Sequence, residues 1–123
     1  VSAGQAQVTV LDLDFGQNFG GHGYLVLGSL TGTAPGFRHQ GVDVPLVLDS
    51  LTLMTASGSP PPMLVYFDGA LDAQGGARAY IATRPGEVAA FVGRSVWFAA
   101  VSSDPGTGLL SNATLALVLQ IVP

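Results

Sequence analysis

The acidic side chains are the residues of this chain with the most obvious potential for chemistry. There are seven aspartates and one glutamate, Glu87. Asp12 and Asp14 lie two residues apart and would share one face of a strand, and the others are scattered: Asp43, Asp49, Asp68, Asp72 and Asp104. Calcium needs about six to eight oxygen ligands from converging loops, and no EF-hand spacing is present. We interpret the aspartates as solvated strand-edge and turn residues, with structural calcium as the alternative.

Histidine and serine give equally little support for catalysis. His22 and His39 fall in different loops, and a zinc or copper site would need further ligands. No serine lies in a G-x-S-x-G elbow. A glycosidase pair would have to come from two aspartates, and no spacing favours any two of them. We therefore predict that the protein is not an enzyme and has no catalytic residues, no metal and no cofactor.

Aromatic side chains offer a different chemistry, because an exposed ring can stack against a sugar. The aromatic candidates for such a platform are Tyr24, Phe37, Tyr66, Tyr80 and Trp97, and the residues that we expect to bind are Tyr80, Tyr66 and Trp97. Tyr80 lies two residues from Arg78, which predicts that both point to the same face of a strand. Core packing is the competing interpretation of these rings. This gives the second function that we consider, a cell-surface module that recognises polysaccharide.

The chain is nearly devoid of charge. Charged residues make up 10% of its 123 residues, against roughly a quarter in an average soluble domain. There is no lysine, the net charge is −4, and there are no cysteines. Without a basic cluster, neither nucleic acid nor an anionic membrane surface is expected as a partner. A surface of small neutral groups repels other copies of itself only weakly.

Several features predict an extracellular or cell-surface location. The chain begins at Val1 rather than at methionine, as we expect of a processed, secreted protein. Its apolar stretches, such as Val96–Val101, are far shorter than a membrane-spanning helix, so we predict no transmembrane segment. Asn112, with Ala113 and Thr114, forms a sequon, which makes Asn112 a possible glycosylation site.

Frequent turn residues predict the fold class. The chain has 17 glycines and eight prolines, which separate short apolar runs of the length of β-strands. We expect one domain, residues 1–123, forming an all-β antiparallel sandwich of about eight strands, either immunoglobulin-like or jelly-roll-like. The expected strands are Gln5–Phe15, Gly23–Ser29, Val42–Asp49, Leu51–Thr55, Met63–Leu71, Gly76–Ala82, Ser95–Ser102 and Ala113–Val122.

Three local signals refine this picture. Asp72–Gly75 has the residues of a type I turn, which we expect to close a hairpin. Pro85–Val92, with a proline near its start and Gly93 just past its end, predicts the single short helix. The apolar alternation slips by one residue after Val10 and again after Leu48, which predicts a bulge or a change of sheet at each place.

The second half of the chain carries a recognisable pattern. It consists of residues 71–79, the proline-started segment, Val96–Val101, Asp104–Gly106 and residues 110–115. This pattern resembles a small β-sandwich module that recurs in secreted and cell-surface proteins of planctomycetes and similar bacteria. The resemblance covers residues 44–122. It implies a sandwich fold in a secreted protein, and it brings no catalytic residues with it.

The N-terminal segment leads to the main functional hypothesis. Residues 1–10 are uncharged and favour a strand, and they are either the first strand of the chain's own sheet or a strand donated to a neighbour. Donation does not close on itself and produces filaments. We therefore expect a structural subunit of a secreted bacterial filament or surface layer, whose partner is a copy of itself. The expected assembly residues are Ala6, Val8, Val10, Thr114, Ala116 and Val118.

Overall fold

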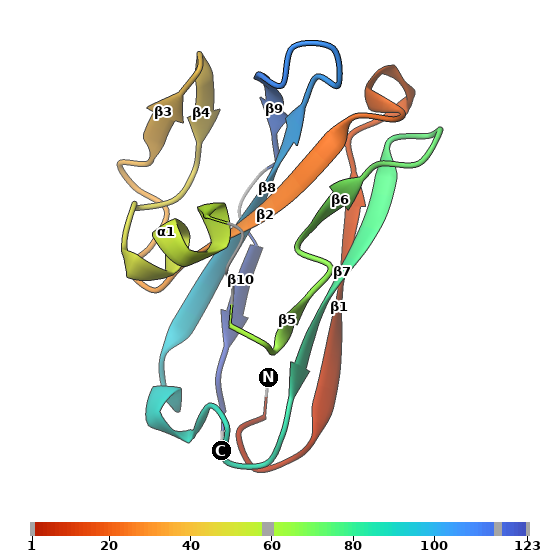
Figure 1. The fold of residues 1–123 in the computed structure, drawn as a ribbon. Helices are drawn as coiled ribbons and strands as arrows, with labels where there is room; N and C mark the ends of the chain where they lie inside the picture. The colour runs from red at the N-terminus through yellow and green to blue at the C-terminus, as the bar shows by residue number, and fades with distance from the viewer. Residues whose placement is uncertain (1, 58–60, 115–116, 123) are drawn as a thin grey trace.

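Antiparallel β-strands are the main secondary structure of the protein, as predicted (Figure 1). The computed structural model describes residues 2–57, 61–114 and 117–122. Within these ranges the strands are β1 (Gln7–Asp14), β2 (Gly23–Ser29), β3 (Phe37–His39), β4 (Val42–Val44), β5 (Leu64–Val65), β6 (Asp68–Ala70), β7 (Gly76–Thr83), β8 (Ser95–Ser103), β9 (Leu110–Ala113) and β10 (Leu117–Gln120). The helical elements are α1 (Ser50–Ala56) and two 3-10 turns, η1 (Gln17–Phe19) and η2 (Ala89–Phe91).

Two sheets enclose the main core and give the sandwich-like arrangement. The first sheet has the order β1-β7-β5, and the second has the order β10-β8-β2-β6, with β9 also paired to β8. Leu11 and Ile81 of the first sheet pack with Val26 and Phe98 of the second. β1 and β10 are therefore both edge strands, and each belongs to a different sheet.

A hairpin of β3 and β4, followed by an extended loop, covers the outer face of the second sheet (Figure 1). Val44 and Leu46 are almost completely buried there, against Leu27 and Val101. Only Val42–Val44 of the expected strand Val42–Asp49 pairs with another strand. Proline cannot donate a hydrogen bond to a ladder, so Pro45 ends the pairing.

The segment Leu51–Thr55 is helical, and its prediction as a strand is wrong. Asp49 is the N-cap of α1: its side chain accepts hydrogen bonds from the backbone N–H groups of Leu51 and Thr52, and the Thr52 hydroxyl accepts one from the Asp49 N–H. This reciprocal capping box stabilises the first turn of a helix. It also explains the apparent slip after Leu48, which marks the approach to a helix rather than a bulge. No helix in the described ranges is long and apolar enough to span a membrane.

The helix expected at Pro85–Val92 is reduced to the short 3-10 turn η2, so the α-helix was predicted in the wrong place. Gly86 has φ of 80°, which is incompatible with a continuous α-helix, and its N–H donates to the carbonyl of Ala3. Val88 nevertheless points inward and is buried, beside Ala3 and Ile121. The segment therefore closes one end of the sandwich.

Two further local predictions are corrected. β1 has no bulge, because it pairs with β7 residue by residue from Gln7 with Thr83 to Asp14 with Gly76. Val8 and Val10 instead occupy the outer face, and Leu11 and Leu13 point to the core. The Asp72–Gly75 turn is present, with a 3.0 Å hydrogen bond from the Gly75 N–H to the Asp72 carbonyl. It does not close a hairpin, because β6 pairs with β2 and β7 pairs with β1 and β5.

Candidate functional site

Two of the predicted ligand-binding residues lie side by side. The rings of Tyr66 and Tyr80 meet edge to face, with centroids 6.0 Å apart and planes 67° apart. They line an open cleft of about 660 Å³ that borders both sheets, with Asp12 and Arg78 of the first sheet and Tyr24 of the second among its other lining residues. We call this surface the tyrosine cleft.

Tyr66 has an unusual backbone conformation. Its φ is 56°, in the left-handed region that large side chains rarely adopt. It lies where the chain crosses from β5 in the first sheet to β6 in the second. The next residue, Phe67, is buried and packs edge to face on Phe98, with ring centroids 5.7 Å apart. The crossing thus anchors one aromatic ring in the core and leaves the Tyr66 ring 67% exposed.

Hydrogen bonding fixes the floor and the rim of the cleft. The Tyr24 hydroxyl donates to the carbonyl of Tyr66 over 2.8 Å. Burial raises the pKa of Tyr24, and the nearby carboxylate of Asp68 raises it further, so the hydroxyl remains a donor at neutral pH. On the rim, Arg78 donates through Nε to Asp12 at 3.0 Å, an exposed ion pair between β7 and β1.

Trp97 does not join the two tyrosines. It lies on β8 of the second sheet and packs with the cluster beneath the β3–β4 hairpin, beside Leu27 and Val44. Tyr24 lines the cleft in its place, although the sequence named Tyr24 only within the wider set of aromatic candidates. The alternation of Arg78 and Tyr80 did indicate correctly that these two share the outer face of β7.

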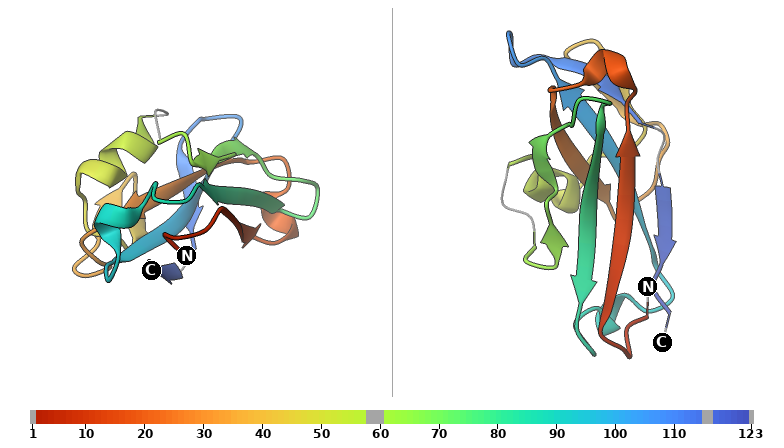
Figure 2. Two further views of the ribbon diagram at one scale, coloured as in Figure 1. Left: turned by 90° about the horizontal axis from the view of Figure 1, so that it is seen from below. Right: turned by 90° about the vertical axis from the view of Figure 1, so that its right-hand side faces the viewer.

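The edges of the two sheets form a second candidate surface. A narrow cleft of about 130 Å³ lies between them, lined by Leu11 and Leu13 of β1, by Thr114 and by Leu117 of β10, over a floor that includes Val26, Phe98 and Ala100. Figure 2 (right) shows β1 and β10 along this side of the sandwich. We call this surface the edge seam. In the described ranges, neither β1 nor β10 has a second strand on its outer side.

The predicted assembly residues fall on three surfaces. Ala6, Val8 and Val10 are exposed at or before the outer face of β1, with Val8 63% and Val10 47% exposed. Thr114 lies at the edge seam, and its hydroxyl accepts a hydrogen bond from the Ala100 N–H. Val118, 50% exposed, pairs with Trp97 in the second sheet. Ala116 lies outside the described residues, and Asn112 is exposed on β9.

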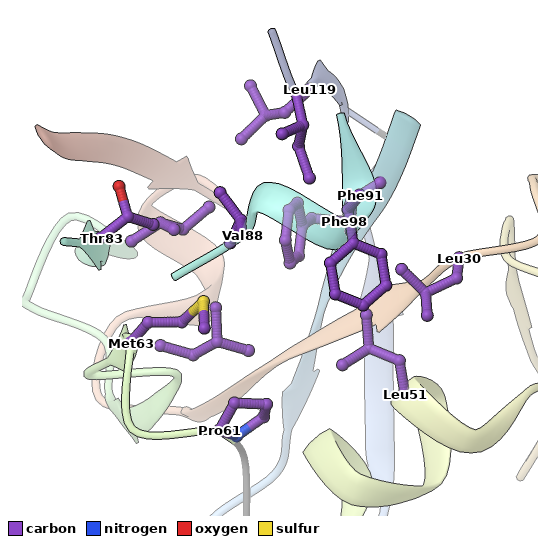
Figure 3. A pocket seen from close by; sticks show the side chains of 13 residues that line it. Leu30, Leu51, Pro61, Met63, Thr83, Val88, Phe91, Phe98 and Leu119 are labelled. Atoms are coloured by element: carbon purple, nitrogen blue, oxygen red, sulfur yellow. The ribbon is translucent and has the colours of Figure 1, made fainter. Parts of the chain in front are cut away.

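An apolar pocket lies between the sheets at the end that holds both termini (Figure 3). Its volume is about 130 Å³, and its lining comes from both sheets, from α1 and from the η2 segment. Met63, Val88 and Phe91 point toward it from one side, and Leu51 points toward it from α1. Thr83 is the one lining residue with a polar side chain among those described. The rest of the lining is apolar.

Asp49 is the most highly connected carboxylate, although its position did not suggest a function. Besides capping α1, its Oδ2 accepts hydrogen bonds from the Leu30 N–H and from the hydroxyls of Ser29 and Thr31. Burial alone would raise its pKa, but these hydrogen bonds outweigh that effect and lower the pKa to about 2. The sequence signal for this role was the aspartate itself, which is a preferred N-cap residue, directly before the helix Ser50–Ala56.

The remaining polar candidates stay apart. His22 lies before β2, with Nδ1 3.3 Å from the Ser111 hydroxyl, whereas His39 lies on β3. Among the described residues no group of three or more acidic or histidine side chains is placed to hold a metal. No protein family, curated protein or solved structure matches this chain. The tyrosine cleft and the edge seam are therefore the surfaces from which we argue function.

Proposed function

We propose that this protein is a structural subunit that assembles head to tail, through the edges of its two sheets, into an extracellular filament or surface layer. The observation that carries the proposal is the pair of open edges, β1 in the first sheet and β10 in the second. Each edge strand carries an exposed valine, Val8 on β1 and Val118 on β10. Unpaired edge strands are templates for pairing with another chain.

The charges of the two edges favour β1 of one copy against β10 of the next. Pairing two β1 strands would bring Asp12 and Asp14 of both copies to the same edge, where like charges repel. β10 (Leu117–Gln120) has no charged residue. Because both edges border the edge seam, a symmetric dimer would use both at once and close, whereas a contact of one β1 with one β10 leaves an edge of each kind free and repeats without closing.

The low overall charge supports the same arrangement. Natural sheet proteins discourage edge pairing with charged residues, prolines or bulges. The first half of β1, Gln7–Leu11, has no charge and no proline, and β1 pairs with β7 without a bulge. Long-range repulsion between copies is weak at a net charge of −4.

Edge pairing also fits the position of the N-terminal segment better than strand donation does. β1 is paired along its whole length with β7 of its own chain, so donation would first have to break that pairing. Pairing of another copy at the free edge of β1 keeps the β1–β7 pairing intact and adds a second ladder of backbone hydrogen bonds. Residues before β1 are also held in their own chain, since Ala3 is buried beside Val88 and Ile121 and its N–H donates to the carbonyl of Val122. Donation of residues 1–10 remains a prediction.

The test is a mixing experiment with two variants, Val8→Lys on β1 and Val118→Lys on β10. The wild-type chain should form filaments visible by negative-stain microscopy, and each variant alone should stay monomeric, because a lysine on an edge strand opposes pairing with another strand. Mixed together, the variants should form a 1:1 heterodimer that grows no further, since its contact uses the one intact β1 edge and the one intact β10 edge and leaves free only the two edges that carry the substitutions. Light scattering after size-exclusion chromatography measures the mass.

The matched control is Leu53→Lys, an equally exposed leucine on α1 that belongs to neither edge. Its filaments should match those of the wild type. If Val118→Lys alone gives a dimer, the contact is between two β1 strands and the proposed polarity is wrong. A wild-type chain that remains monomeric at millimolar concentration would reject the assembly altogether.

A further inference from the structure

We propose that the tyrosine cleft is a binding site for a neutral saccharide, with the ring of Tyr66 as its stacking platform. This inference goes beyond assembly, because the aromatic rings of the cleft, Tyr24, Tyr66 and Tyr80, do not line the edge seam. Four observations support it: the backbone of Tyr66, its anchoring, the aromatic pair and the charges at the rim.

The backbone of Tyr66 is the first observation. Among the described residues only Tyr66 and Gln40 combine a side chain with a positive φ. A bulky residue in this region is an outlier, and such outliers persist where the surrounding structure holds them, frequently at binding sites. Glycine or asparagine would fit the turn at lower cost. A tyrosine that is 67% exposed contributes little burial to the fold in return.

The anchoring of Tyr66 makes its ring a rigid surface. The Tyr24 hydroxyl holds its carbonyl at 2.8 Å, and the carbonyl of the following residue, Phe67, accepts from the Val26 N–H at 2.6 Å. The Tyr80 ring supports the Tyr66 ring edge to face. Because a tyrosine has few rotatable bonds and is held at two points here, a ligand that stacks on it loses little free energy in ordering the site.

The rim supplies hydrogen-bonding groups of both signs. The Arg78 guanidinium is held by Asp12 through Nε, and its remaining N–H groups are donors for a hydroxyl. Asp12 and Asp72 also line the cleft and provide acceptors. A sugar presents C–H groups on a ring face and hydroxyls that both donate and accept around its edge. This combination matches an aromatic platform bordered by a carboxylate and a guanidinium.

The same groups argue against other ligands. The carboxylates of Asp12 and Asp72 would repel a phosphate or a nucleic acid. A wholly apolar ligand would leave the Asp12–Arg78 pair desolvated without new partners. The cleft, at about 660 Å³, lies within the range of volumes found for small-molecule sites.

The test titrates neutral hexasaccharides of glucose, mannose, galactose and N-acetylglucosamine into the isotopically labelled chain and follows amide shifts by NMR. Assembly is kept out of the measurement by using the Val118→Lys chain, whose substitution lies in the other sheet. At least one sugar should shift the amides of Tyr66 and Tyr80. If none of the four shifts them at millimolar concentration, the saccharide site is rejected, whatever the outcome of the mixing experiment.

Two substitutions assign the role of the ring. Tyr66→Gly keeps the positive φ and removes the ring, so the fold should be retained while affinity falls by about tenfold or more. Tyr66→Phe keeps the ring, and its affinity should stay within about threefold of that of the parent. Equal affinities for Tyr66→Gly and the parent would overturn the platform, and Leu53→Ala on α1 is the control for a non-specific effect.

Discussion

The hydroxyl of Tyr24 donates a 2.8 Å hydrogen bond to the carbonyl of Tyr66, across 42 residues of sequence and from the second sheet to the point where the chain changes sheets. The Tyr24 ring is buried, so the bond ties an exposed, positive-φ residue to the core. Loss of this bond should therefore affect both the stability of the fold and the order of the tyrosine cleft.

Tyr24→Phe removes only that hydroxyl. A typical hydrogen bond contributes about 0.5–1.5 kcal/mol, and we expect unfolding free energy to fall by that amount in urea denaturation. Amide exchange at Tyr66 and Phe67 should become faster, while exchange in β8 should be unchanged. Equal exchange rates at Tyr66 in both proteins would show that the bond does not hold the crossing.

The pKa of Asp49 predicts how stability depends on acidity. Its value is about 2 in the folded protein and 3.8 in the reference state, so the unfolded chain binds a proton more readily. Stability from Asp49 is therefore fully present above about pH 5 and is lost as the pH falls through 3.8 toward 2. The loss is at most about 2 kcal/mol, and solvent screening reduces it because Asp49 is partly exposed.

Asp49→Asn should reduce the loss of stability at low pH. The amide oxygen can still cap α1, but the NH2 group cannot accept the hydrogen bonds from Leu30 and Thr31. We expect lower stability at pH 7 and a smaller change between about pH 5 and pH 2, measured by thermal unfolding at several pH values. Asp104→Asn, a carboxylate of an exposed turn, is the comparison, and an identical pH profile for Asp49→Asn and wild type would contradict the assignment.

The apolar pocket in Figure 3 predicts a substitution that stabilises the protein. Val88→Ile adds one methylene that can extend into the pocket, and filling such a space commonly gains about 0.5–1 kcal/mol. Val101→Ile makes the same change in the tightly packed cluster under the hairpin, where overpacking costs about 1–3 kcal/mol. Opposite shifts in melting temperature are expected, and a stabilising effect of both changes would argue against a distinct pocket.

Gly75 and Gly16, at the end of the sandwich away from the pocket, should differ in how well they tolerate alanine. A Cβ on Gly75 would collide with the backbone carbonyl of Gly16, and both residues have positive φ. Gly75→Ala should cost more than about 3 kcal/mol. A Cβ on Gly16 would meet no other atom within 4 Å, so Gly16→Ala should lower the free energy of unfolding only through its unfavourable positive φ, by about 1 kcal/mol. Guanidinium denaturation of both variants measures the difference, and equal costs would contradict the close approach.

Strand positions were predictable where apolar and polar residues alternate or where turns are clearly marked. β2, β7 and β8 fall within one residue of their expected bounds, because glycine and proline delimit them and their inward residues are strongly apolar. The helix was misplaced, since Leu51 and Leu53 alternate as on a strand and only the capping by Asp49 favours the helix. The local pattern of apolar residues therefore does not distinguish a strand from a helix that depends on a capping side chain.

The tyrosine cleft was predictable only in part. Arg78 and Tyr80 share a face of β7 by alternation alone. Their meeting with Tyr66 depends on the change of sheet between β5 and β6, which is a tertiary property. The outward direction of Val8 and Val10 was also hidden, because Leu11 and Leu13 on the other face are equally apolar.

The pairing of β1 with β7 has a consequence for how the protein folds. Gln7 lies 76 residues before Thr83, so the first strand must wait for a partner that is far along the chain. Distant pairings of this kind form slowly, and unpaired strands are vulnerable meanwhile. During that interval a neighbouring chain competes with β7 for the same backbone groups. The rate at which β1 pairs with β7 therefore decides whether newly made chains fold as separate subunits or pair with one another first.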